Sequence, residues 1–138
     1  MSSVELRGWC PGAEFVSVAR LPNYRLDFTR YSVKRQGGVA DVVRARGETV
    51  WGVLYDVPSG EMAALDRKEG VASRAYERKR VMVATAAGPR VRAVTYSVID
   101  KEPGQTPSEH YLGLILAGAR EWALPEAYVQ MLEGMRGG

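Results

Sequence analysis

The chain has 138 residues, of which 46% are hydrophobic and 25% charged, and its formal net charge is +3. These proportions are typical of a soluble globular protein and exclude a disordered tail, a collagen-like fibre and a disulfide scaffold. We expect one domain spanning residues 1–138, because a chain of this size can bury about 68% of its unfolded surface. Cys10 is the only cysteine in the sequence. It cannot form an internal disulfide, and we expect a reducing, cytoplasmic location.

The positive charge is concentrated in two segments. Residues 20–46 hold seven basic residues against two acidic ones, and residues 74–92 hold six against one, so each segment carries +5. The aromatic or helix-groove motifs that usually accompany basic clusters in nucleic-acid binders do not occur here. We interpret the two segments as solvated strand faces and expect no nucleic-acid partner. No apolar run approaches the roughly 20 residues that span a bilayer, so we expect no membrane partner.

The first half of the chain predicts a short helix followed by strands. Ser2 and Ser3 with Glu5 resemble a capping box, and predict a helix that ends at Cys10-Pro11-Gly12. Apolar and polar residues then alternate over 14–20 and 24–29, which predicts two strands around a turn at Pro22-Asn23. A polar loop over 32–38 ends in Gly37-Gly38. Two more strands are predicted over 39–43 and 49–57, around a turn at 44–48. The second of these is apolar nearly throughout, which favours a central position.

The second half predicts helices around a further hairpin. A helix over 60–69 ends at Gly70, and strands over 76–86 and 90–99 follow it. Thr106 is the predicted N-cap of the next helix, with Pro107 at its first position and Glu109 completing a capping box. That helix should run to about Trp122. A last helix begins at Leu124-Pro125 and carries Tyr128, Leu132 and Met135 on one face. The order of elements predicts an α+β fold, a small mixed β-barrel or sheet with flanking helices.

The residues that could support chemistry are few. His110 is the only histidine in the sequence, so a site of several His ligands is impossible, and we expect no metal and no cofactor. His110 begins a predicted helix, where a surface or structural role is favoured over catalysis. The sequence contains neither a G-x-S-x-G nucleophile elbow nor a glycine-rich phosphate loop.

Glu69 is the candidate that periodicity singles out. Met62, Leu65, Asp66 and Glu69 fall on one stripe of the predicted helix over 60–69. Because Met62 and Leu65 must face the core, Glu69 is carried toward the interior at the negative end of the helix dipole. Both effects disfavour the charged carboxylate, which suits a group that takes up and returns a proton. The simpler alternative is a Glu side chain that escapes to solvent because the helix ends there.

Several spaced motifs resemble the γ-glutamylcyclotransferase-like (AIG2-like) family. The segment 50–71, VWGVLYDVPSGEMAALDRKEGV, is similar to a strand of type V-W-G-V-x-Y leading into a helix that ends D-x-x-E-G. Residues 19–28, ARLPNYRLDF, and the segment 37–41 fall in the family order. So do residues 107–121, PSEHYLGLILAGARE, and the closing helix from Leu124. The resemblance covers nearly the whole chain and implies the γ-glutamylcyclotransferase-like fold.

The resemblance also implies site residues. Glu69 would be the catalytic acid and base, Tyr76 and Tyr111 would contact the substrate, and Gly37-Gly38 would form part of the pocket wall. The implied reaction is cyclisation of a γ-glutamyl amide to 5-oxoproline with release of the amine, which places the chain in glutathione metabolism as a lyase or transferase. The partner would be a small γ-glutamyl compound, either an amino acid, an amine or an acylated biosynthetic intermediate. The resemblance is also compatible with a homodimer.

One family hallmark does not occur in the sequence. The family has an N-terminal strand that runs into a Y-G-S-N type loop, whose backbone holds the substrate and which precedes a helix like residues 2–9. Nothing precedes Met1 in the sequence, and we expect a chain truncated before this helix. The alternative function is a catalytically silent domain of the same fold that binds a small ligand or partner. A third hypothesis, a nucleic-acid binder that uses the two basic segments, ranks last.

Overall fold

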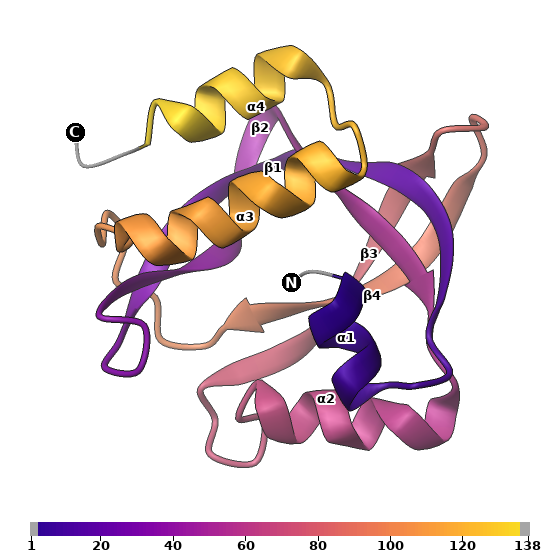
Figure 1. Cartoon of the computed structure of the whole chain (residues 1–138), viewed down its shortest axis with the longest axis horizontal. Coiled ribbons are helices and arrows are strands. Elements are labelled where there is room, and N and C mark those ends of the chain that lie inside the picture. Colours follow the sequence, from indigo (N-terminus) through magenta and orange to yellow (C-terminus); the bar gives the residue numbers. More distant parts are fainter. Residues whose placement is uncertain (1–2, 136–138) are drawn as a thin grey trace.

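Two long antiparallel strands form the frame of the molecule (Figure 1). The computed structural model describes residues 3–135. Strand β1 (Glu14–Ser32) pairs along its whole length with β2 (Gly37–Asp56). The two strands predicted on either side of residues 22–23 are therefore one continuous strand, β1. The two predicted on either side of residues 44–48 are likewise one strand, β2, and each strand has an irregularity near its middle.

The second hairpin is attached to the first over a short distance. Strands β3 (Tyr76–Thr85) and β4 (Arg90–Val98) pair with each other along nearly their full length. Strand β3 meets β1 at two positions, Ala19 and Arg20. The strand order β2-β1-β3-β4 gives a four-stranded antiparallel sheet in which β2 and β4 are the edges.

Four α-helices flank the sheet at opposite ends of the molecule in Figure 1. Helices α3 (Glu109–Glu121) and α4 (Glu126–Glu133) lie together over one end of the β1–β2 hairpin. Helix α1 (Ser3–Trp9) lies beside α2 (Met62–Lys68) at the other end. The predicted α+β fold is confirmed in its sheet form. The barrel form was wrong for the described residues, because the edge strands β2 and β4 are not paired with each other.

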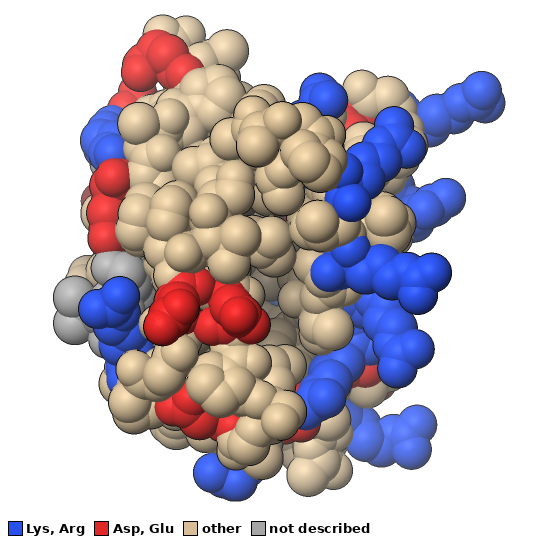
Figure 2. Space-filling view, turned by 90° about the vertical axis from the view of Figure 1, so that its right-hand side faces the viewer, with Lys and Arg blue, Asp and Glu red and all other residues tan. Residues whose placement is uncertain are grey.

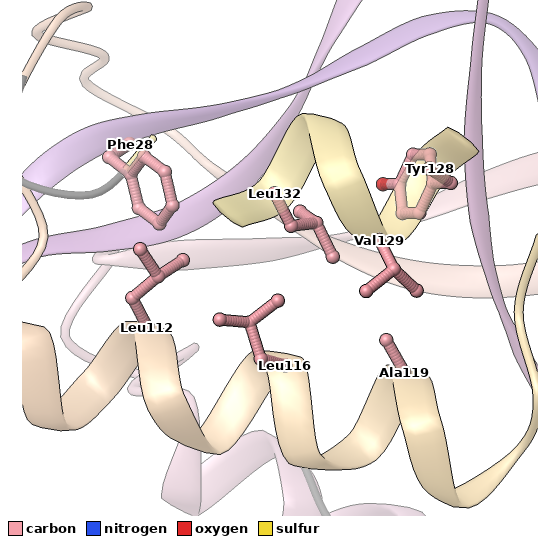
Figure 3. Close-up of a cluster of buried hydrophobic side chains, with 7 residues drawn as sticks. All are labelled: Phe28, Leu112, Leu116, Ala119, Tyr128, Val129 and Leu132. Atoms are coloured by element: carbon pink, nitrogen blue, oxygen red, sulfur yellow. The ribbon is translucent and has the colours of Figure 1, made fainter. Parts of the chain in front are cut away.

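The main core lies between α3, α4 and the β1–β2 hairpin (Figure 3). Its side chains point toward one another from three elements because each helix repeats an apolar residue every three or four positions. The buried members are Phe28, Leu112, Leu116, Ala119, Tyr128, Val129 and Leu132. A smaller core joins α1 to α2 through Leu6, Cys10, Ala13 and Leu65.

The predicted turn at Pro22-Asn23 is a bulge within β1. Asn23 adopts φ +66°, and its Oδ1 accepts a hydrogen bond from the Gly47 N–H at 3.1 Å. Gly47 lies opposite, in the irregular part of β2, with φ +84°. Because the two irregularities face each other, both strands bend together and continue. The sequence pattern detected the bend and could not distinguish a bulge from a turn.

Two helix boundaries also differ from the predictions. The N-cap of α3 is Ser108 rather than Thr106, since the Ser108 hydroxyl accepts a hydrogen bond from the Tyr111 N–H. Helix α4 ends at Glu133, and Met135 packs against the main core from just beyond it. The capping box predicted from residues 2, 3 and 5 involves atoms outside the part of the chain that the structure describes.

The basic segments lie on exposed parts of the strands. Arg44, Arg46, Arg80, Arg90 and Arg92 are all exposed. Figure 2 shows Lys and Arg side chains gathered along one side of the face it presents, with a broad uncharged surface beside them. This arrangement agrees with the interpretation of the basic residues as solvated strand faces.

Truncating Leu116 tests the main core. Leu116 is 1% exposed and Leu114 on the same helix is 42% exposed. We expect Leu116→Ala to lower the free energy of unfolding by about 2–5 kcal/mol, because it leaves a cavity between α3 and α4. Leu114→Ala should change it by about 0.5 kcal/mol or less. Denaturant unfolding monitored by circular dichroism measures both, and equal losses would contradict this packing.

Candidate active site

Glu69 caps the end of α2 within a tightly hydrogen-bonded turn. The Gly70 N–H donates to the Arg67 carbonyl at 3.2 Å and the Val71 N–H donates to the Asp66 carbonyl at 2.9 Å. These are the two bonds of a Schellman motif, in which Glu69 is the C-cap and Gly70 the C′ residue. Gly70 adopts φ +69°, which glycine reaches without strain. The predicted C′ glycine is confirmed, and it fixes the backbone that carries Glu69.

The helix that leads to Glu69 differs slightly from the predicted one. Its first turn is a 3₁₀ turn, η1 (Ser59–Glu61), and the α-helical part begins at Met62. Leu65 is buried and Met62 packs against it from a half-buried position, as the predicted stripe requires. The Glu69 side chain is 19% exposed, so it does not escape to solvent. Its Oε1 accepts a hydrogen bond from the Lys68 Nζ at 2.9 Å.

Tyr76 begins β3 and lies within electrostatic reach of Glu69. Burial raises the pKa of the Tyr76 phenol, and the neighbouring acidic groups of Tyr111, Glu69 and Asp41 raise it further. Arg30 acts in the opposite direction. The phenol therefore stays protonated at neutral pH and can donate a hydrogen bond.

Tyr111 reaches the same place from the first turns of α3. Its hydroxyl accepts a hydrogen bond from the Ala40 N–H at 3.0 Å, and its ring meets Phe28 edge-on at 6.4 Å between centroids. The Arg35 guanidinium carbon lies 5.5 Å from the Tyr111 ring centroid, within the range of a cation–π contact. Tyr111 and Glu69 both act electrostatically on the Tyr76 phenol, so Tyr76 lies near each of these two residues, which come from other elements.

The glycine pair is required by a close approach of two chain segments. The Gly38 N–H donates to the Thr106 carbonyl at 2.8 Å. A Cβ atom at Gly38 would lie 2.6 Å from the Gln105 Cβ, and one at Gly37 would lie 2.7 Å from the Ser108 nitrogen. The pair thus lets the start of β2 pack against the segment that leads into α3. That segment continues into α3, which carries Tyr111, so the glycines help to position it.

Asp41 is a buried carboxylate that the sequence analysis did not select as a site residue. Its side chain is 0% exposed, and its Oδ2 accepts hydrogen bonds from the Thr29 hydroxyl and the Lys101 Nζ, both at 2.7 Å. Its Oδ1 accepts from the Ser97 hydroxyl at 3.2 Å and from the Val98 N–H at 3.1 Å. Because every one of these donors comes from β1, β4 or the segment after β4, Asp41 links β2 to all three.

The sequence offered a weak signal for this network. Asp41 interrupts an apolar strand, and a charged residue at a position expected to be buried needs a partner. Its partner Lys101 lies 60 positions away, in a loop whose sequence carries no pattern. Pairing of that kind is visible only once the strands are placed.

A hollow of about 930 Å³ lies away from this group of residues, beside α1 and α2. Its walls are largely apolar, and none of the predicted site residues lines it in the described structure. Size favours the hollow as a ligand site. Chemistry favours Glu69, because a largely covered carboxylate near the Tyr76 phenol can transfer protons.

The described residues contain no group of three or more His, Cys, Asp and Glu side chains that could hold a metal ion. His110, the sole histidine in the sequence, lies exposed in the first turn of α3. Among the described helices, none is long and apolar enough to cross a membrane.

Comparison with known proteins identifies related sequences. The AIG2-like family profile matches residues 49–132. The chain is 33% identical to the mouse γ-glutamylcyclotransferase over 129 residues, covering 91% of this chain and 68% of that protein. It is 34% identical to the human γ-glutamylcyclotransferase over the same shares of both chains.

Solved structures agree with the sequence comparison. A structure of a γ-glutamyl cyclotransferase superposes with a TM-score of 0.90 at 32% identity, covering 96% of this chain and 80% of that one. The structure of YkqA from Bacillus subtilis superposes with a TM-score of 0.81 at 28% identity, covering 97% of this chain and 48% of that one. The fold inferred from the sequence is thus the fold of these proteins.

Adding one methyl group at Gly38 tests the close approach of β2 to the segment before α3. We expect Gly38→Ala to lower the free energy of unfolding by about 1–3 kcal/mol, because the new Cβ forces backbone and Gln105 apart. Gly113 in α3 has open space around it, and Gly113→Ala should raise the free energy of unfolding by about 0.5–1 kcal/mol. If Gly38→Ala is as stable as the parent protein, the contact is not as tight as described.

The alkaline stability of the protein tests the surroundings of Tyr76. Since folding raises the pKa of Tyr76 above its ordinary value of 10.0, its stabilising contribution is complete below about pH 10 and is lost as the pH rises further. Tyr76→Phe should therefore reduce the fall of melting temperature between about pH 9 and pH 11. Tyr31→Phe, at an exposed tyrosine, controls for removal of a hydroxyl. An unchanged pH profile in Tyr76→Phe would contradict the prediction.

Proposed function

Since the chain belongs to the AIG2-like family and matches γ-glutamylcyclotransferases over most of its length, we propose that it converts a γ-glutamyl amide to 5-oxoproline and a free amine. The observation that supports this proposal most strongly is the grouping of Glu69 with Tyr76 and Tyr111. A largely covered carboxylate near the Tyr76 phenol has the chemical groups that such a reaction needs.

The reaction makes modest demands on the protein. The substrate's own α-amine attacks the γ-carbonyl carbon and closes a five-membered ring, so the nucleophile is held near its target by the substrate itself. The bond between the γ-carbon and the leaving nitrogen then breaks. The α-ammonium loses two protons on becoming the ring N–H, one before the attack and one after it, and the departing nitrogen gains two protons on leaving as an ammonium. A single group that takes and returns a proton twice therefore balances the reaction.

Glu69 is the proposed acid and base. In the absence of substrate its carboxylate is paired with the Lys68 ammonium at 2.9 Å. The α-ammonium of the substrate carries the same charge as Lys68 and can take its place beside the carboxylate. Because the two Glu69 oxygens are largely shielded from water, the proton they accept is retained for the leaving amine.

Tyr76 and Tyr111 are the proposed substrate contacts. The Tyr76 phenol remains protonated and can donate to a substrate oxygen. Tyr111 is held by Ala40 and by the edge of Phe28, so its position is fixed before substrate binds. Gly37 and Gly38 are proposed to form the adjoining wall, which their close packing against residues 105–108 holds in place.

A second candidate function is supported by the hollow beside α1. Arg80 and Arg92 line this largely apolar hollow, and Glu69 does not. A catalytically silent domain that binds a small anionic and apolar ligand there would not need Glu69.

Replacing Glu69 tests the proposed reaction. We expect Glu69→Gln to reduce 5-oxoproline formation from γ-glutamyl-alanine by about 10²–10⁴-fold, because the amide cannot accept a proton. The melting temperature should change little. Glu77→Gln, at an exposed position on β3, is the matched control and should keep full activity. Undiminished turnover by Glu69→Gln would exclude the proposed role.

Calorimetric titration separates the two candidate functions. If γ-glutamyl-alanine binds the parent protein and is converted, the first candidate holds. If γ-glutamyl-alanine is not converted, and its binding is weakened by Arg92→Gln but not by Glu69→Gln, the second candidate holds instead.

A further inference from the structure

The Asp66 carboxylate joins α2 to both strands of the β3–β4 hairpin. Its Oδ1 accepts hydrogen bonds from the Arg78 Nε at 2.8 Å and from the Tyr96 hydroxyl at 2.7 Å. Its Oδ2 accepts from the Arg78 Nη2 at 2.6 Å. The guanidinium thus binds both carboxylate oxygens in the two-point geometry that fixes orientation as well as distance. Arg78 and Tyr96 are cross-strand partners, so the contact holds α2 at one point of the hairpin.

The directions of the pKa shifts of Asp66 and Tyr96 agree with these hydrogen bonds. The hydrogen bonds from Arg78 and then Tyr96 hold the pKa of Asp66 below its usual range. Desolvation, followed by the hydrogen bond to Asp66, raises the pKa of Tyr96. At neutral pH Asp66 is therefore charged and Tyr96 is a donor, so the contact is complete.

The same residue also fixes the turn that carries Glu69. The Asp66 carbonyl accepts the Val71 N–H in the Schellman motif, and the Gly70 carbonyl accepts the Ala75 N–H at 3.1 Å. Asp66 is thus held through its side chain and through its backbone. The chain from Asp66 to Arg78 forms a closed loop whose two ends are joined by the ion pair.

Within this loop, Glu69 follows Asp66 at a short distance along the chain and Tyr76 precedes Arg78 at a short distance. Asp66 and Glu69 are three residues apart on one face of the helical end, and Tyr76 and Arg78 are two residues apart on one face of β3. Holding Asp66 against Arg78 therefore sets Glu69 beside Tyr76. Burial is the main cause of the raised pKa of Tyr76, and Glu69 is among the neighbouring acidic groups that raise it further, which agrees with this placement.

We propose that Asp66, held by Arg78 and Tyr96, is a positioning residue that fixes the Glu69 carboxylate beside Tyr76. The proposal rests on the proposed function for its effect on turnover, but not for its effect on structure. The ion pair is partly exposed, with side-chain exposures of 45% for Arg78 and 25% for Asp66. Such pairs contribute little to stability, so positioning and stability can be separated by experiment.

The turnover experiment uses four variants of the contact and one matched control. Asp66→Asn removes the charge, Arg78→Lys removes the two-point geometry, and Tyr96→Phe removes the third hydrogen bond. We expect kcat to fall by up to about 10²-fold in Asp66→Asn, with KM and the melting temperature nearly unchanged, because a displaced base lowers the rate of the chemical step. Asp66→Glu, which keeps the charge, should restore part of kcat.

The control is Glu133→Gln, which breaks the exposed ion pair with Arg120 between α3 and α4. Like Asp66→Asn, this substitution takes a carboxylate away from an arginine, but the two residues belong to α3 and α4. The proposal is overturned if kcat falls no more in Asp66→Asn than in Glu133→Gln.

A second measurement does not depend on turnover. In protein labelled with ¹³C-tyrosine, Glu69→Gln should shift the Tyr76 ring resonance, because a nearby charge is removed. In the Asp66→Asn background we expect the same Glu69→Gln change to shift it much less. An equal shift in both backgrounds overturns the proposal. If the parent protein converts no γ-glutamyl amide, the proposed function fails while this measurement still decides the role of Asp66.

Discussion

The buried carboxylate of Asp41 is the interaction on which the assembly of the site depends. A charge with 0% exposure is stable only when its oxygens are fully hydrogen-bonded. Asp41 meets that condition with donors from β1, β4 and the segment after β4, together with the Val42 N–H of its own strand. Since the backbone pairing of β3 with β1 covers only Ala19 and Arg20, this contact helps to fix where the second hairpin lies.

Both proposed substrate contacts follow from that placement. Val98, whose N–H donates to Asp41, is the cross-strand partner of Tyr76, and Ala40, the residue before Asp41, donates to the Tyr111 hydroxyl. Asp41 thus supports one side of the site, and the contact of Asp66 with the β3–β4 hairpin supports the other. These two groups of hydrogen bonds hold the elements that carry Tyr76, Tyr111 and Glu69, which suits the proposed site because its groups must keep their positions.

Sequence patterns predicted the elements better than the connections between them. The stripe of Met62, Leu65 and Glu69 was visible because helical periodicity is local, and Gly70 was recognised because a helix end needs it. The bulge at Asn23 gives the same sequence signal as a turn, since the residue types favoured at both are the same. The pairing of Asp41 with Lys101 and of Asp66 with Arg78 joins residues on different elements, and no local pattern encodes it. The roles of Tyr76 and Tyr111 came from the family resemblance, because a single tyrosine carries no positional signal.

In the proposed reaction the substrate's own α-amine closes the ring, with one carboxylate of the protein moving the protons. Incubating the protein with a γ-glutamyl amide labelled with ¹⁵N at the α-amine, and following the products by NMR, tests it most directly. Cyclisation predicts that the label appears in the ring nitrogen of 5-oxoproline, in step with release of the unlabelled amine. Appearance of labelled free glutamate would show hydrolysis by water and would contradict the account.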